Sequence, residues 1–227
     1  MQKKYKCFLF DLDGTLLDTA PEFLTSLNVL LKKNKLPLVN DSFVRKRVSD
    51  GVGKLIQDSF HIDEKHIDFE STRDSLLDEY NKNFPLSKSF SGVDTVLKNL
   101  SEKKIDWMIV TNKPKKFSLE ICNKLKWDKY AKAIISPEDA NGRRKPDPAS
   151  LEKALSETST EKDLSVYVGD NWRDIEAAKN AGIDSVLAMY GYLEEKDASL
   201  LNPTSKIGSI SEPVSYTHLT LPTTPYV

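Results

Sequence analysis

The chain has 227 residues, of which 39% are hydrophobic and 30% are charged, and its formal net charge is -1. This length suits one domain with an insert, large enough to bury a sizeable core. Lysines and acidic residues are mixed along the chain, which excludes an obvious basic face for nucleic acid and a polybasic membrane anchor. We therefore expect no nucleic acid and no membrane among the partners. The expected oligomeric state is a monomer or a homodimer.

The amino-terminal residues predict a cytoplasmic protein. Residues 1–6 carry the positive charge of a secretory signal, but Asp11 and Asp13 interrupt the apolar run behind them. That run is too short for a signal's apolar region or for a membrane span. The two cysteines, Cys7 and Cys122, fall within a predicted strand and a predicted helix, and we expect both to be small buried thiols.

The first predicted element is a strand over residues 6–10, and two acids follow it closely. A buried parallel strand delivers functional groups at its carboxyl end. Because side chains alternate along an extended chain, Asp11 and Asp13 can share one side and meet at one point. Two carboxylates that close require a raised pKa on one of them or a bound cation, and Mg2+ fits best. The ordinary alternative is a strand followed by an Asp-Gly turn with solvated acids.

Residues 19–85 are predicted to be wholly helical. Thr19 and Glu22 predict a capping box at the start of the first helix, with Pro21 in its first turn. Apolar residues then recur at helical spacing through the segment. The expected helices span about 19–35, 41–49, 53–60 and 69–84.

From Pro85 onward, helical stretches alternate with short β-rich runs, which favours a parallel sheet with helices on both faces. We predict an α/β fold, a doubly wound parallel sheet with an inserted α-helical cap domain. Residues 1–18 and 86–213 are assigned to the core, and residues 19–85 to the cap. The expected strands span 105–110, 133–135, 164–168 and 185–188, and the expected helices lie around 93–100, 121–125, 148–155 and 174–181.

Ligands of open parallel sheets bind beyond the carboxyl ends of the strands. One predicted strand runs into Thr111 and Asn112, another leads to Asp170 and Asp174, and Lys145 precedes a helix start between them. Acids, a hydroxyl and a lysine at strand ends are the groups that phosphoryl transfer needs. A glycine-rich P-loop is missing from the sequence, which disfavours nucleotide triphosphate chemistry.

Each of these residues also has an ordinary explanation when taken alone. Thr111 and Asn112 could cap the next helix, Lys145 could be a loop lysine, and Asp174 could stabilise a helix amino terminus through its dipole. Their order on successive strand ends favours a single site over separate coincidences.

Residues 8–19, FLFDLDGTLLDT, resemble the first motif of the haloacid dehalogenase superfamily of phosphatases, and the resemblance covers all four superfamily motifs from Phe8 to Asp174. It implies that Asp11 is a nucleophile that forms an aspartyl phosphate. It also implies that Asp13 is the general acid and base, a residue that dehalogenase-like members lack.

The resemblance assigns further roles at the other strand ends. It implies that Thr111 and the amide of Asn112 bind phosphate, and that Lys145 offsets the charge of phosphate and of Asp11. The implied cofactor is Mg2+. Its implied ligands are the carboxylates of Asp11 and Asp170, the carbonyl of Asp13, and Asp174 directly or through water.

Substrate selection in capped members of this superfamily comes from the insert. We expect the turn containing Ser49 and Gly51 to contact substrate, with nearby Arg45, Arg47 and Lys54 meeting an anionic group, although a solvated loop is the plain alternative. The chain resembles the phosphoglycolate phosphatases and the N-acetylmuramic acid 6-phosphate phosphatases in residues 16–21, 110–114 and 190–192. We therefore expect a Mg2+-dependent phosphomonoesterase that acts on a small phosphorylated metabolite. A sugar phosphomutase of the β-phosphoglucomutase type and a non-catalytic phosphate sensor stay open as alternatives.

The last residues differ from everything before them, with few charges, several threonines and prolines, and no periodicity. Residues 214–223 can be back-translated into a transposon-end sequencing adapter. We therefore expect residues 214–227 to be read-through rather than part of the fold, and the core to be truncated near Glu212.

Overall fold

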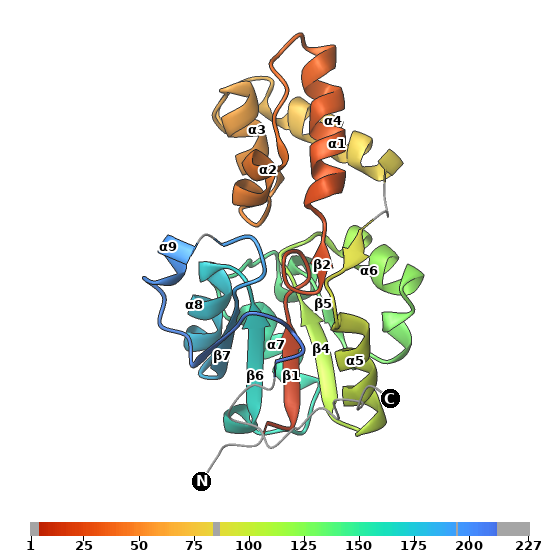
Figure 1. Ribbon diagram of the computed structural model, residues 1–227, viewed down its shortest axis with the longest axis vertical. Coiled ribbons are helices and arrows are strands. Elements are labelled where there is room, and N and C mark those ends of the chain that lie inside the picture. The colour runs from red at the N-terminus through yellow and green to blue at the C-terminus, as the bar shows by residue number, and fades with distance from the viewer. Residues whose placement is uncertain (1–4, 84–86, 194, 213–227) are drawn as a thin grey trace, which may run out of the picture. The chain divides into compact units, whose positions relative to one another are not determined.

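The computed structural model describes residues 5–83, 87–193 and 195–212 (Figure 1). The chain divides into two compact units, one made of Met1–Leu16 with Ser89–Val227 and the other of Leu17–Lys88. Residues 214–227, for which we predict read-through, lie outside the described residues.

The first unit contains a six-stranded sheet in the order β5-β4-β1-β6-β7-β8, and its neighbouring strands pair in parallel. This order confirms the predicted doubly wound α/β fold. The edge strand β8 is not foreseen by the sequence, because its three residues include one buried apolar side chain, Ile207. The strands are β1 (Cys7–Phe10), β4 (Asp106–Val110), β5 (Ile134–Ile135), β6 (Ser165–Gly169), β7 (Asp184–Ala188) and β8 (Ser205–Ile207).

Side chains of alternate strand residues build the core on the two faces of this sheet. Cys7 and Leu9 of β1 belong to a buried cluster that includes Leu151 of α7 and Ala177 of α8. Figure 1 shows α5 and α6 on the other side of the strands from α8. Burying both faces explains the continuous apolar runs of the central strands. The helices of this unit are α5 (Val93–Glu102), α6 (Lys115–Lys124), α7 (Ala149–Ser156), α8 (Trp172–Ala181) and the short α9 (Glu195–Ala198), and single 3-10 turns are η1 (Trp127–Lys129), η2 (Pro137–Ala140) and η3 (Lys162–Leu164).

Both cysteines are free, buried thiols, as the sequence predicts. Burial raises the pKa of Cys7 and of Cys122 to about 12, so neither thiol is an active nucleophile at neutral pH. Among the described helices, none has both the length and the apolar character that crossing a membrane requires.

Within its described residues, the second unit contains four helices. A separate two-stranded sheet pairs β2 (Leu17–Asp18) with β3 (Lys88–Ser89). The rings of Phe23 and Tyr80 stack with their centroids 4.3 Å apart, which joins the first helix to the fourth. The helices are α1 (Ala20–Lys33), α2 (Asp41–Val48), α3 (Val52–Phe60) and α4 (Phe69–Asn83).

The predicted capping box at the start of α1 is wrong. Thr19 has helical rather than extended backbone angles and makes no side-chain capping bond. The Glu22 carboxylate instead accepts a hydrogen bond from the backbone N–H of Ser87 at 2.5 Å, and further ones from the hydroxyls of Ser87 and Tyr80. Glu22 is buried, so bonds to a distant segment replace the local cap.

Candidate active site

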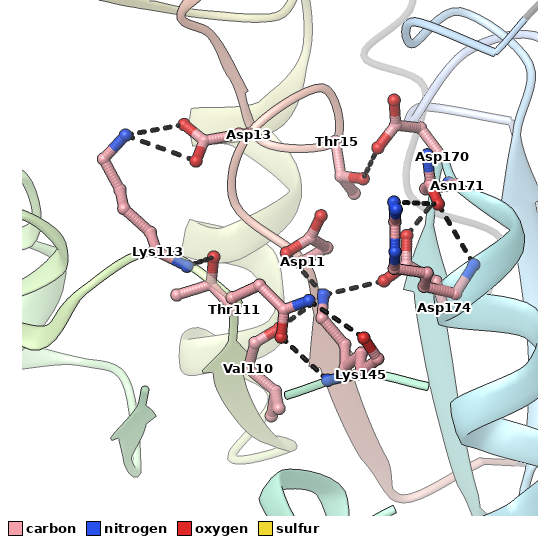
Figure 2. Close-up of polar contacts among 12 residues, drawn as sticks. Asp11, Asp13, Thr15, Val110, Thr111, Lys113, Lys145, Asp170, Asn171 and Asp174 are labelled. Carbon is pink, nitrogen blue, oxygen red and sulfur yellow. Dashed lines mark hydrogen bonds and ion pairs between the residues drawn. The ribbon is translucent and has the colours of Figure 1, made fainter. Parts of the chain in front are cut away.

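The candidate site lies at the carboxyl ends of three adjacent strands. Asp11 follows β1, Thr111 follows β4 and Asp170 follows β6, and the sheet places these strands in the order β4-β1-β6. Figure 2 shows the polar groups converging in front of the end of β1. The sequence expectation that separate strand ends meet at one edge is realised here.

Lys145 is the centre of a buried hydrogen-bond network. Its Nζ donates to Asp11 Oδ1 at 2.8 Å and to Asp174 Oδ1 at 2.7 Å. The Tyr167 hydroxyl is a third acceptor at 2.6 Å, and the Val110 carbonyl lies 3.3 Å away, so three N–H groups face four acceptors. Burial alone lowers the pKa of Lys145, but the carboxylates of Asp11 and Asp174 raise it above its usual value, which keeps the ammonium charged.

Tyr167 is a member of this network that the sequence reasoning missed. Its hydroxyl, which accepts from Lys145, lies 2.7 Å from the Val110 carbonyl and 3.2 Å from Asp174 Oδ1. The available signal was a phenol within the predicted strand over residues 164–168, because a buried Tyr hydroxyl needs a partner. Its place in β6 aims the hydroxyl at Lys145.

Asn112 positions the loop that carries Lys145. Its side-chain amide donates to the Lys145 carbonyl at 3.1 Å and accepts from the Lys145 N–H at 2.8 Å. Asn112 therefore does not cap α6, whose N-cap residue is Pro114. The predicted contact between the Asn112 amide and phosphate stays a prediction.

Thr111 brings a buried hydroxyl to the end of β4. Its Oγ1 accepts a hydrogen bond from the Lys113 N–H at 3.1 Å. A hydroxyl that accepts a bond keeps its own hydrogen for donation, so Thr111 can donate to an anionic ligand. This geometry is compatible with the predicted phosphate contact.

Three buried carboxylates gather beside Lys145. Oxygens of Asp11, Asp170 and Asp174 lie within 4.8 Å of one another. Burial raises the pKa of Asp11 to about 7, although Lys145 opposes the rise and Asp174 adds to it. Burial, followed by the charges of Asp174 and Asp11, also raises the pKa of Asp170 well above its usual value. Both shifts mark a concentration of negative charge away from water.

This cluster fits a hard divalent cation. The ammonium of Lys145 contacts two of the three carboxylates and cannot balance three negative charges. The donors are all oxygens, which Mg2+ prefers. The excess charge and the donor type are what a Mg2+ site requires.

Asp174 serves the helix and the site at once. Its Oδ2 accepts from the Asn171 N–H at 2.9 Å and completes a capping box at the start of α8, while Oδ1 faces Lys145. Because Asn171 is the N-cap residue, α8 begins at Trp172, two residues before the predicted start. The capping and functional interpretations of Asp174 are therefore compatible.

Asp170 is held by two loops. The Thr15 hydroxyl lies 3.4 Å from its Oδ1, and the Tyr192 N–H donates to its Oδ2 at 2.8 Å. A Cβ on Gly191 would lie 2.3 Å from the Asp170 Cβ, and a Cβ on Gly14, whose φ is +85°, would lie 2.3 Å from Oδ2. Two glycines thus allow the backbone to approach the carboxylate.

We expect Gly191→Ala to weaken the binding of Mg2+ to the cluster of Asp11, Asp170 and Asp174. The added methyl group must displace Asp170 or the loop that holds it, because a 2.3 Å contact is not tolerated. Disturbing the partners of a metal ligand typically costs about 10–100-fold in affinity. Calorimetric titration of the purified protein with Mg2+ checks this. Gly208→Ala, where a Cβ meets only the flexible Glu212 side chain at 3.0 Å, should leave the titration unchanged.

The Asp13 carboxylate points to Lys113 and is not part of the cluster of Asp11, Asp170 and Asp174. Its two carboxylate oxygens lie 3.1 and 3.2 Å from the Nζ of Lys113. The strand ends at Phe10, and a turn at Leu12 follows, so the alternation of an extended chain no longer applies at Asp13. The predicted metal contact of Asp13 through its carbonyl stays a prediction.

Ser49 and Gly51 belong to the helical unit. Ser49 is the C-cap residue of α2, and Gly51, with φ +92°, is the N-cap residue of α3. The nearby basic side chains bind acids of their own unit: Arg45 pairs with Asp18 and Asp41, and Arg47 and Lys54 both pair with Asp58. These charges are therefore already balanced, and the predicted substrate contacts of Ser49 and Gly51 stay predictions.

The chain is similar to known proteins over most of its length. The family model for haloacid dehalogenase-like hydrolases matches residues 8–188. An N-acetylmuramic acid 6-phosphate phosphatase of Pseudomonas putida is 32% identical over 195 residues, covering 86% of this chain and 87% of that protein. A phosphoglycolate phosphatase of Xanthomonas campestris pv. campestris is 35% identical over 192 residues, covering 82% and 84%.

The fold is also similar to solved structures. The crystal structure of a predicted phosphoglycolate phosphatase from Haemophilus somnus matches with a TM-score of 0.78 at 23% identity, covering 92% of this chain and 96% of that one. Because the family model spans the strands that carry the site and the sequence relatives are phosphatases, the chain belongs to the haloacid dehalogenase-like hydrolases, as a phosphoric monoester hydrolase.

Proposed function

We propose that this enzyme is a Mg2+-dependent phosphomonoesterase that works through an aspartyl phosphate on Asp11. The observation that carries the proposal is the network in which Lys145 bonds Asp11 and Asp174 beside Asp170. The same network combines a fixed carboxylate with an excess of negative charge suited to a cation.

In this proposal the metal is held by the carboxylates of Asp11 and Asp170 and the carbonyl of Asp13, with Asp174 binding it directly or through water. When bound, Mg2+ would offset the negative charge of the acids and of the substrate's phosphate. Lys145 adds a second positive charge and fixes the Asp11 carboxylate, and Thr111 and the Asn112 amide donate to phosphate oxygens.

Asp11 then attacks phosphorus, and the bond between phosphorus and the substrate oxygen breaks. Asp13 gives its proton to the leaving oxygen, which departs as an alcohol. Asp13, now a carboxylate, takes a proton from water as the water oxygen attacks the phosphorus of the aspartyl phosphate. Inorganic phosphate leaves, and the Asp11 carboxylate and the Asp13 acid are restored.

The substrate class that we propose is a small phosphate ester that also bears a carboxylate. The support is the names of the two kinds of relative, which refer to phosphoglycolate and to N-acetylmuramic acid 6-phosphate. Both compounds join a phosphate to a carboxylate-bearing group. We propose that the turn containing Ser49 and Gly51 contacts the part of the substrate beyond the phosphate.

Phosphate release by the purified enzyme tests this proposal. The panel contains 2-phosphoglycolate, N-acetylmuramic acid 6-phosphate and hexose 1-phosphates, each with Mg2+ and with EDTA. We expect release from at least one carboxylate-bearing ester, abolished by EDTA and restored by Mg2+. Conversion of hexose 1-phosphate to hexose 6-phosphate without free phosphate would assign a mutase instead. Phosphate release that survives chelation by EDTA would refute the requirement for Mg2+.

A further inference from the structure

The two acids of the first motif are each paired with a different lysine. Asp11 is bonded to Lys145, which also binds Asp174. Asp13 is bonded to Lys113, which comes from the loop after β4. Figure 2 shows the Asp13 carboxylate turned toward Lys113 and away from Asp174. The motif therefore pairs each of its two carboxylates with its own lysine.

Lys113 is built into the structure rather than lying on its surface. Its side chain is 4% exposed, whereas that of Asp13 is 18% exposed. Its backbone N–H donates to Thr111 Oγ1 at 3.1 Å, and the next residue, Pro114, is the N-cap residue of α6. A buried lysine with a fixed backbone brings its ammonium to a defined point, which a surface lysine does not.

The ammonium lies at nearly equal distances from both Asp13 oxygens, 3.1 and 3.2 Å. Contact with both oxygens restricts rotation of the carboxylate as well as its position. The contact thus holds the Asp13 carboxylate beside Lys113 at the turn that begins at Leu12.

We propose that Lys113 is a positioning residue for the proton transfers of Asp13, an inference that rests on the proposed function. Lys113 keeps its own protons throughout. It holds the Asp13 carboxyl group where its proton passes to the substrate oxygen as the bond from that oxygen to phosphorus breaks. Proton transfer by a placed side chain is worth about 10²–10⁴-fold, so losing the placement has a measurable cost.

The leaving group separates this role from a merely structural ion pair. The leaving group of an alkyl phosphate departs as an alcohol, so its departure depends on the proton from Asp13. A p-nitrophenolate is a stable anion and leaves without a proton. Since kcat/KM reports the steps up to departure of the leaving group, a defect in placing Asp13 affects the alkyl ester much more than the aryl ester.

The test compares kcat/KM for 2-phosphoglycolate and for p-nitrophenyl phosphate in wild type and Lys113→Met. We expect a loss of about 100-fold for the alkyl ester and a small change for the aryl ester. The matched control is Lys115→Met, which removes a lysine two positions away that pairs with Asp139 at 2.5 Å. This control should leave the ratio of the two substrates unchanged.

A double variant checks that Lys113 acts through Asp13. In an Asp13→Asn background, adding Lys113→Met should leave the alkyl-to-aryl ratio unchanged, because no proton remains to be placed. Should Lys113→Met not fold, Lys113→Gln, which is shorter and uncharged, carries the same prediction. N-acetylmuramic acid 6-phosphate replaces 2-phosphoglycolate if it is the alkyl ester that wild type hydrolyses.

Two results would overturn the inference: equal losses for both esters in Lys113→Met, or no loss for either. A further change of the ratio in the Asp13→Asn background would also overturn it. Failure of the proposed function looks different, because wild type itself would then release no phosphate from any ester tested.

Discussion

The Asp11→Asn variant should lose kcat by about 10⁴-fold or more and remain folded. An amide cannot attack phosphorus to form an acyl phosphate, and removing a nucleophile costs losses of this size. Folding should survive because burial already raises the pKa of Asp11 to about 7, so its environment disfavours the charged form that the variant lacks. Lys145 keeps its bonds to Asp174 and Tyr167.

Phosphate release and thermal unfolding of the same preparation measure both halves of this expectation. Asp163→Asn, which changes an exposed acid in η3, is the control and should keep full activity. Wild-type turnover by folded Asp11→Asn would show that another residue is the nucleophile.

Lys145→Met should cost both activity and stability. The side chains of Lys145 and Asp174 are 3% and 1% exposed, so removing the ammonium leaves buried carboxylates without their partner. Breaking a buried ion pair in this way typically costs about 3–5 kcal/mol of unfolding free energy. Denaturant unfolding measures the loss. Lys132→Met, which breaks the half-exposed pair with Asp106 at 3.0 Å, should cost less than about 1 kcal/mol.

Two further measurements test whether the lost stability comes from charge. Adding Asp11→Asn to Lys145→Met removes one of the unpaired negative charges and should recover part of the stability. Mg2+ should also stabilise Lys145→Met, because a ligand that binds only the folded state shifts the equilibrium toward it. A double variant less stable than Lys145→Met would mean that packing, and not charge, explains the loss.

Much of the site can be predicted from the sequence because its residues follow strands. Asp11 and Asp170 come directly after apolar runs, and a parallel sheet brings such positions together at one edge. The predicted α/β core is confirmed for the same reason, since alternating helices and strands leave few topologies. Periodicity therefore carries information about both the fold and the place of the site.

The partners of these residues depend on geometry that periodicity does not encode. Asp13 meets Lys113 because a turn begins at Leu12, which strand alternation cannot anticipate. Glu22 leaves its local capping box for Ser87, 65 residues away in the sequence, because it is buried. In both cases a long-range contact overrides a valid local rule.

Chemical trapping of the phosphorylated residue tests the central claim most directly. Borohydride reduces an acyl phosphate to an alcohol, which converts a phosphorylated aspartate to homoserine that peptide mass spectrometry can locate. With substrate and Mg2+ present before an acid quench, we predict homoserine at position 11, and none after chelation by EDTA. Homoserine at another aspartate, or steady phosphate release with Asp11 never modified, would contradict the account.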